Sequence, residues 1–188
     1  MTLAPAPPGG SATDEVTRWA LLAQQGDPVA AAAFIRATQA EVWRFVASLV
    51  DPGSADDLTQ ETYLRAFRAL PRFEARASAR TWLLGIARRA CADHVRTVVR
   101  RRRLLAQVAS WGDEQAPAAD AATMSAGTLQ LLDQLNPGQR EAFVLTQLLG
   151  LSYEEAAVTL DVPIGTIRSR VARARSQLVQ LVTAAMAG

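Results

Sequence analysis

The stretch from residue 136 to residue 181 constrains the fold of this chain more than any other part of the sequence. Asn136 is followed by Pro137 and, three residues after the cap position, by Gln139. A capping side chain, a preset first turn and a reciprocal side chain at this spacing begin a helix. Gly150 can adopt the left-handed backbone conformation that ends one. We therefore expect one helix between Pro137 and Gly150.

Two more helices follow at short intervals. Ser152 and Glu155 have the S-x-x-E spacing of a capping box, which predicts the start of a second helix. Only Asp161 and Val162 separate the end of this helix from Pro163, which suits the first turn of a third. Two helices joined by so short a turn must cross at a steep angle, which is the geometry of a helix-turn-helix.

The third helix is predicted to be apolar on one face and basic on the other. Apolar or small residues recur at steps of three and four, namely Ile164, Ile167, Val171, Ala174 and Leu178. Small residues and arginines share or flank the outer face, and arginine can pair with guanine or hold phosphates in the major groove. A solvated basic helix has the same composition, but the tight turn, the two caps and the basic face together favour DNA binding. The candidate DNA contacts are Thr166, Arg168, Ser169, Arg170, Arg173 and Arg175.

Length and cysteine content set the broad class of the protein. The chain has 188 residues, enough for one domain or two small ones, and its one cysteine, Cys91, excludes an internal disulfide. We therefore expect a reducing compartment. The sequence has no signal peptide and no run of about eighteen or more apolar residues, so we expect a cytoplasmic protein without membrane insertion. His94 is the only histidine, so we expect no metal site.

The net charge of +2 hides an uneven distribution. Residues 1–60 hold three Arg and seven acidic residues, whereas residues 61–103 hold twelve Arg and three acidic residues. Residues 104–139 hold four acidic residues and no basic one. The basic segment lies upstream of the helix-turn-helix and predicts a second surface that binds a polyanion. An exposed basic helix end is the alternative, because cations stabilise the C-terminus of a helix.

The N-terminal half predicts further helices and no strand. Residues 1–13 are rich in Pro, Gly and Ala, and we expect them to be disordered. Helices are predicted from residue 14 to Gly26, over 28–50, from Ser54 (with Asp57 as its capping partner) to Pro71, and over 78–103. Trp82 is predicted to be a core residue rather than a base-stacking platform, because it lies beside Leu83 and Ile86 at packing spacing.

Residues 104–125 separate two groups of helices. They have weak periodicity and an acidic balance, and we expect a flexible linker there. A further helix over 126–135 then leads into the helix-turn-helix. The sequence therefore predicts an all-α protein with two helical domains joined by a flexible linker. The domains are expected at 14–103 and 126–182, with 183–188 as a tail.

The helix predicted to begin at Ser54 has an acidic first turn. Asp57, Glu61, Leu64 and Arg68 form one stripe along it, and Glu61 with Arg65 is a favourable pair at a spacing of four. Acidic residues suit the N-terminus of a helix, so a solvated face explains this stripe without any ligand. A docking surface for a protein partner is the alternative, and the residues alone favour the solvated face.

Three segments together resemble a known family. They are SADDLTQETYLRAFRALPRF, then SARTWLLGIARRACADHVR, then LNPGQREAFVLTQLLGLSYEEAAVTLDVPIGTIRSRVARAR. In this order they are similar to the extracytoplasmic-function sigma factors, the smallest promoter-specificity subunits of bacterial RNA polymerase. The resemblance covers most of residues 14–181. It implies a protein that binds core RNA polymerase and directs it to a class of promoters.

The resemblance also implies roles for particular residues. It places a surface for core polymerase at Asp56, Asp57, Gln60, Glu61, Leu64 and Arg65, which reverses the preference for a solvated face. It places single-stranded promoter DNA near Phe73, Glu74, Arg76, Ser78, Arg80, Arg88 and Arg89. The last helix of the helix-turn-helix would contact the more distant promoter element, and the linker would run toward the RNA exit path. Many members of the family are held inactive by an anti-sigma factor, which is a further candidate partner.

Two other classes of function fit parts of the sequence. A stand-alone helix-turn-helix regulator would bind duplex DNA as a dimer without polymerase, but the largest basic surface lies far from the helix-turn-helix. A small helical enzyme is disfavoured because no Gly-rich phosphate loop, pair of histidines or activated nucleophile is visible. We therefore expect no enzymatic activity, no cofactor and no small-molecule substrate.

Overall fold

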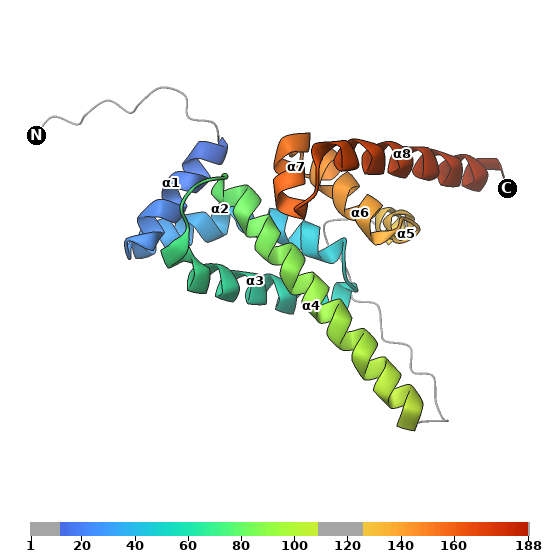
Figure 1. Ribbon diagram of the computed structural model, residues 1–188, viewed down its shortest axis with the longest axis horizontal. Helices are drawn as coiled ribbons and strands as arrows, with labels where there is room; N and C mark the ends of the chain where they lie inside the picture. The colour runs from blue at the N-terminus through green and yellow to red at the C-terminus, as the bar shows by residue number, and fades with distance from the viewer. Residues whose placement is uncertain (1–11, 109–125, 188) are drawn as a thin grey trace, which may run out of the picture.

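The computed structural model describes residues 12–108 and 126–187 of the chain. These residues form eight α-helices with short 3-10 and π segments, and they contain no strand (Figure 1). The predicted all-α fold class is confirmed. The N-terminal residues 1–11, most of the predicted linker (109–125) and the last residue lie outside the described residues, so the expectations of disorder and flexibility there remain predictions.

Four helices make up what we call the N-terminal unit. They are α1 (Ala12–Gln24), α2 (Pro28–Ala47), α3 (Ala55–Ala69) and α4 (Ala79–Val108), and each packs against at least two of the others. Helix α1 begins two residues before the predicted start. Helix α4 continues five residues beyond Arg103, where the prediction ended it, so residues 104–108 are helical rather than linker.

Local signals account for most of these boundaries. Asp27 caps α2 by accepting hydrogen bonds from the backbone N–H groups of Val29 and Ala30, at 2.8 and 3.1 Å. Pro71 ends α3, and the chain continues as a 3-10 turn over Leu70–Arg72. The capping box predicted from Ser54 and Asp57 is wrong. The hydroxyl of Ser54 instead donates to Asp51 Oδ2 at 2.8 Å, because a 3-10 turn brings the two side chains together before α3 begins.

The remaining helices make up the C-terminal unit. They are α5 (Ala126–Asp133), α6 (Pro137–Phe143), α7 (Tyr153–Leu160) and α8 (Ile164–Ala187), with a π segment over Val144–Leu148. Both predicted capping boxes of the helix-turn-helix are present, with Asn136 and Gln139 on α6 and Ser152 and Glu155 on α7. Gly150 has a φ of +70°, as predicted for the residue that ends this helix. Helix α8 extends through the predicted tail to Ala187.

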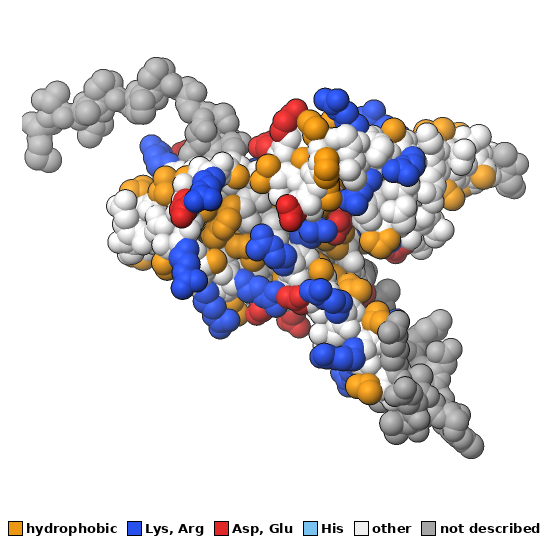
Figure 2. All heavy atoms as spheres, in the orientation of Figure 1, with side chains coloured by type: hydrophobic (Ala, Val, Ile, Leu, Met, Phe, Trp, Pro, Cys, Tyr) orange, Lys and Arg blue, Asp and Glu red, His pale blue; other side chains and the backbone are white. Residues whose placement is uncertain are grey.

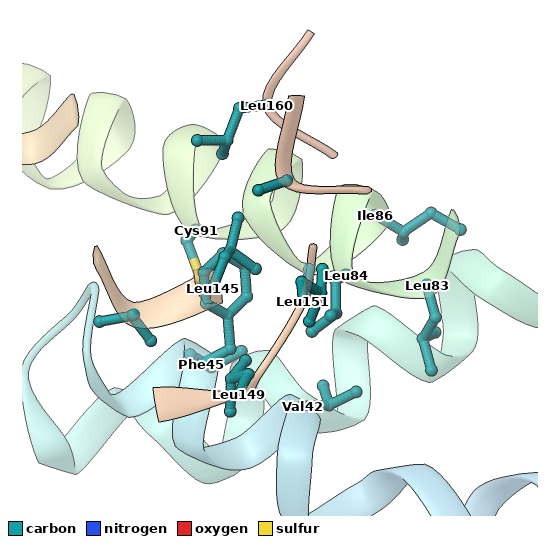
Figure 3. Packing of buried hydrophobic residues seen from close by; sticks show 14 of the residues in the cluster. Val42, Phe45, Leu83, Leu84, Ile86, Cys91, Leu145, Leu149, Leu151 and Leu160 are labelled. Carbon is teal, nitrogen blue, oxygen red and sulfur yellow. The ribbon is translucent and has the colours of Figure 1, made fainter. Parts of the chain in front are cut away.

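The two units pack directly against each other. Helix α4 lies against α7, and the buried side chains form a single cluster that runs through both units. Figure 3 shows Phe45 of α2 and Leu84 and Cys91 of α4 facing Leu145 and Leu149 of the C-terminal unit. Gly85 of α4 lies at this contact, where a Cβ would be 3.8 Å from the carbonyl oxygen of Thr159 on α7, an ordinary van der Waals distance. Nothing in the sequence predicted this contact.

Candidate nucleic-acid interface

The apolar face of α8 is buried as predicted. Ile167, Val171 and Ala174 are almost fully buried in the C-terminal unit, and Leu178 is partly buried beside them. The opposite face is exposed and carries Gly165, Arg168, Ser169, Ala172, Arg173 and Ser176. The outer face of α8 therefore presents small side chains and two arginines to solvent, as a helix that enters the major groove requires.

Arg168 and Arg173 on this outer face differ in how they are held. Arg168 has no ion-pair partner among the residues that the structure describes. Arg173 donates from Nε to the carbonyl oxygen of Ser169 and from a terminal nitrogen to Ser169 Oγ, both at 3.2 Å. The Ser169 hydroxyl in turn donates to the carbonyl oxygen of Thr166 at 3.0 Å. Arg173 is thus held along the helix by uncharged groups, which leaves its charge available to a phosphate or a base edge.

Arg170 and Arg175 contact their own unit instead. The guanidinium of Arg170 lies over Gly138, so close that a Cβ at this glycine would stand 3.1 Å from Arg170 Cζ. Arg175 donates a hydrogen bond to the side chain of Gln147. Of the six predicted DNA contacts, these two are the ones whose side chains are turned toward α6 and the π segment.

The segment between α3 and α4 is partly anchored in the core. Phe73 is 6% exposed and its ring lies 4.8 Å from that of Trp82, so both aromatic rings contribute to packing. Gln24 of α1 donates to the carbonyl oxygens of Leu70 and Phe73, at 2.9 and 3.0 Å. Glu74 and Arg76 are exposed beyond this anchor. A base could therefore reach the tip of the segment without displacing Phe73.

Two of the arginines predicted near single-stranded DNA lie between the two units. Arg80 Nε donates to both carboxylate oxygens of Glu41 at 2.9 Å, and a terminal nitrogen of Arg80 donates to the carbonyl oxygen of Leu149. The hydrogen bond to Glu41 raises the pKa of Arg80 above its usual value. Arg88 Nε donates to Glu141 Oε1 of α6 at 3.1 Å. We call these contacts the unit junction.

The acidic stripe of α3 lies on the surface. Asp56, Asp57 and Gln60 are exposed, and Leu64 is 55% exposed. The indole N–H of Trp43 donates to Asp56 at 2.7 Å. Leu64 is thus a single exposed apolar side chain about two turns along α3 from Asp56 and Asp57.

Arg65 connects this stripe to α4. It donates to Glu61 at 2.7 Å on its own helix and to Asp93 at 2.6 Å on α4. Two hydrogen bonds hold the pKa of the Asp93 carboxyl below its usual value, and the one from Arg65 has a larger effect than the one from Arg96. Arg65 therefore also fixes α3 against α4.

Two expected absences concern metal ions and membranes. The described residues include no group of three His, Cys, Asp or Glu side chains placed to hold a metal ion. Within residues 12–108 and 126–187, no helix is both long and apolar enough to cross a bilayer.

Cys91 is buried, and this burial raises the pKa of its thiol to about 12.

Comparison with known proteins shows what the two units are. Residues 34–103 match the family described as Sigma-70 region 2, and residues 127–178 match Sigma-70 region 4. The chain is 54% identical over 168 residues to the ECF RNA polymerase sigma factor SigC of Mycobacterium tuberculosis, which covers 88% of this chain and 90% of the relative. The chain belongs to the extracytoplasmic-function sigma factors.

Other relatives and solved structures agree with this assignment. The sigma factor is 34% identical over 178 residues to SigE of Mycolicibacterium smegmatis, covering 88% of this chain and 68% of that one. A solved structure of CnrH in complex with the cytosolic domain of CnrY has a TM-score of 0.70 at 26% identity, covering 91% of this chain and 99% of CnrH. The sigma factor RpoE of Bartonella quintana, solved with the anti-sigma factor NepR, has a TM-score of 0.68 at 30% identity, covering 79% of this chain and 94% of RpoE.

The unit junction lies between the two matched regions of this sigma factor. Sequence reasoning missed its acceptors, Glu41, Glu141 and the carbonyl of Leu149. Arg88 and Glu141 are 53 residues apart in the chain, and no periodicity or charge pattern relates them. In the C-terminal unit, the acceptor that the structure describes for Arg80 is the backbone carbonyl of Leu149. Because every residue has such a carbonyl, the type of side chain at position 149 could not have predicted the contact.

Proposed function

We propose that this sigma factor directs core RNA polymerase to promoters with two separate elements, and that α8 contacts the more distant one as duplex DNA. The observation that carries the proposal is the outer face of α8. It combines small side chains with Arg168 and Arg173, whose charges have no acidic partner among the residues described. Thr166 and Ser169 lie on the same helix and add hydrogen-bonding groups. Arg170 and Arg175 support the helix on its own unit.

We infer that α3 is the docking surface for the polymerase. Leu64 supplies exposed apolar area, Asp56, Asp57 and Glu61 supply negative charge on the N-terminal side of it along the helix, and Gln60 adds a neutral hydrogen-bonding group. Arg65 holds this face against α4. The face is accessible while the two units are packed together, so docking needs no prior rearrangement.

Capture of the opened strand would use the tip between α3 and α4 and the arginines that follow it. Glu74, Arg76 and Arg89 are exposed, whereas Arg80 and Arg88 are held in the unit junction. Ser78 is partly buried and bonded to Thr81. We therefore infer that the two units separate before the full strand surface forms.

An anti-sigma factor is a further partner, and a groove beside the unit junction could accommodate it. The RpoE structure of Bartonella quintana contains the anti-sigma factor NepR. In this chain a groove of about 410 Å³ lies between α4, the end of α2 and α5, and its lining includes Val95, Val99 and Leu129. An apolar partner segment that contacts both walls would stabilise the packed arrangement.

We place the protein in the cytoplasm with its polymerase and assign it no catalytic activity of its own.

Transcription in vitro tests the proposal. Purified protein and core polymerase on a library of genomic fragments should yield transcripts from a small set of templates that share two spaced elements. Core polymerase without the protein is the control, and the absence of any added transcript would refute the proposal. A stand-alone regulator is distinguished by gel filtration with core polymerase and no DNA, because only a sigma factor should co-elute.

A further inference from the structure

The groove beside the unit junction has an uncovered apolar wall. It has a volume of about 410 Å³ and lies between α4, the end of α2 and α5. Val95 and Val99 stand on the same face of α4, four residues apart, and Leu129 of α5 lines the groove opposite them. The two valines are 45% and 41% exposed. Covering them would remove apolar area from water, which favours any apolar side chain that can reach the groove.

Unbalanced positive charge lies at one end of this groove. Arg102 belongs to the lining, and its neighbours Arg100 and Arg101 are exposed. None of these three arginines has an ion-pair partner among the described residues. Helix α4 has no acidic residue after Asp93. Figure 2 shows hydrophobic and basic side chains together along the part of α4 that extends away from the body of the molecule.

The carboxylates of the groove have other partners. Asp133 pairs with Arg140, with Oδ1 and Nη1 2.9 Å apart. Asp51 accepts a hydrogen bond from the hydroxyl of Ser54 at 2.8 Å. The charge of Arg102 is therefore available to an acidic group from elsewhere.

The chain that leaves α4 has the composition that this groove requires. Residues 109–125 lie outside the described residues, and they connect the helix of one wall, α4, to the helix of the other, α5. Trp111 is the one aromatic residue of this segment, and Asp113 and Glu114 follow it closely. An indole ring carries a large apolar area, and its face attracts an arginine. The two carboxylates are the first acidic residues after Asp93 in the sequence.

The length of the chain determines which end of the groove Trp111 can reach. Arg102 and Val99 lie about 9 and 14 Å before Val108 along α4, at about 1.5 Å per residue. The three residues from Val108 to Trp111 extend by at most about 10–11 Å. If the chain folds back, its backbone reaches the level of Arg102, and the indole side chain can cover the turn between Arg102 and Val99. Trp111 is thus within reach of the basic end only.

We propose that, in the free protein, the chain after α4 folds back and seats the ring of Trp111 against Val99 and Arg102. Asp113 and Glu114 then lie near the exposed arginines at 100–102. A short tether gives an effective concentration in the millimolar range, so a weak contact is enough to fill the groove. The rest of the segment remains a tether between the two units.

This contact would regulate access to the groove. A partner segment that binds there has to displace Trp111, so its apparent affinity falls in proportion to the fraction of molecules in which the groove is open. The inference does not rest on the roles proposed for α3 and α8. It also holds whether or not an anti-sigma factor exists.

Alkylation of a cysteine placed in the groove tests the proposal. In the full-length protein with Cys91 replaced by Ala, Val99→Cys puts a thiol at the proposed contact. Its reaction with iodoacetamide should be about tenfold slower than in the same protein carrying Trp111→Ala, which corresponds to about 1.4 kcal/mol of docking. Trp111→Phe should retain most of the protection, because an aromatic ring still covers the site.

The matched control uses an exposed valine outside the groove. Val179 of α8 is 65% exposed and is not among the lining residues. The alkylation rate of Val179→Cys should not depend on Trp111. Far-ultraviolet circular dichroism should show equal helicity in all these proteins, so that a difference in rate reports the groove rather than unfolding.

The charges are tested separately. Asp113→Asn/Glu114→Gln should reduce the protection of Val99→Cys, and this reduction should be smaller at high salt, because salt screens exposed charges. Unchanged protection would overturn the contribution of the two carboxylates.

Two results would overturn the docking itself. Equal rates with and without Trp111 would leave the groove open in the free protein and available to an external partner. Protection that increases with protein concentration would identify the occupant as a second copy of the chain. Because the assay contains neither polymerase nor DNA, its result is independent of the transcription experiment.

Discussion

Reversing the charge of Arg88 should drive the two units apart. Arg88 on α4 and Glu141 on α6 form an ion pair across the unit junction, with Nε and Oε1 3.1 Å apart. Their side chains are only 31% and 16% exposed. Arg88→Glu would place two carboxylates at this site, and Glu141→Arg would place two guanidinium groups there. Each change replaces an attraction with a repulsion without altering either unit's own core.

The size of the effect follows from the distance and the exposure. At an effective dielectric constant of about 20, two unit charges at this distance interact by roughly 5 kcal/mol. Partial exposure to solvent reduces such a pair to about 1–2 kcal/mol. Reversal changes the sign, so the packed arrangement should lose about 2–4 kcal/mol. That loss corresponds to a shift of roughly 30- to 700-fold toward separated units.

Small-angle X-ray scattering measures the outcome directly. Arg88→Glu and Glu141→Arg should each increase the radius of gyration of the free protein, and the double variant Arg88→Glu/Glu141→Arg should restore it, because the ion pair forms again with its partners exchanged. Equal radii in all four proteins would show that the pair does not hold the units together. Larger radii in both single variants without recovery in the double variant would show that shape, rather than charge, is what the substitutions disturb.

Three further predictions concern single sites. Phe73→Ala should lower the free energy of unfolding by about 3–5 kcal/mol in urea titrations, because it removes a buried ring beside Trp82; a loss below about 1 kcal/mol would place Phe73 outside the core. Arg173→Ala should cost about 1–3 kcal/mol in promoter affinity if it contacts a base edge. If Ser169 acts by holding Arg173, adding Ser169→Ala to that variant should cost nothing more, whereas additive losses would give Ser169 its own DNA contact. Burial raises the pKa of Cys91 from 9.0 to about 12, so the stability tied to its protonated thiol is present below pH 9 and is lost as the pH rises toward 12. At pH 9, alkylation by iodoacetamide, followed by mass spectrometry, should be roughly a hundredfold slower in the native protein than in urea, and similar rates would contradict burial.

The sequence by itself determined the local structure of the helix-turn-helix. Asn136 and Gln139 begin α6 and Ser152 and Glu155 begin α7, as their spacing predicts. A cap acts on backbone groups three residues away, so the neighbours along the chain are enough to specify it. The apolar stripe of α8 was predictable for the same reason, because helical periodicity needs only the order of the residues.

The sequence also indicated candidate binding stretches, but not which of their side chains are free of contacts within the chain. On the predicted helix Thr166 points outward, whereas Arg168, Arg170 and Arg175 all flank the apolar face, so the sequence does not distinguish these three arginines. The structure separates the arginines by their partners: the guanidinium of Arg170 lies over Gly138 and Arg175 donates to Gln147, whereas the exposed Arg168 has no ion-pair partner among the described residues. Ser54 shows the same limit at a helix start, since its partner depends on a 3-10 turn that the capping pattern does not encode.

Only the tertiary structure decided how the two units meet. Neither residue type nor position on the helix distinguishes Arg80 and Arg88 from the exposed arginines of α4 in the sequence. In the structure, however, they donate hydrogen bonds to Leu149 and Glu141 in the opposite unit. Caps and periodicity act within one or two turns, whereas these contacts join residues more than 50 positions apart, and they form only once both hydrophobic faces are buried together. Long-range burial, rather than any motif, therefore decides which arginines of this sigma factor are available to DNA.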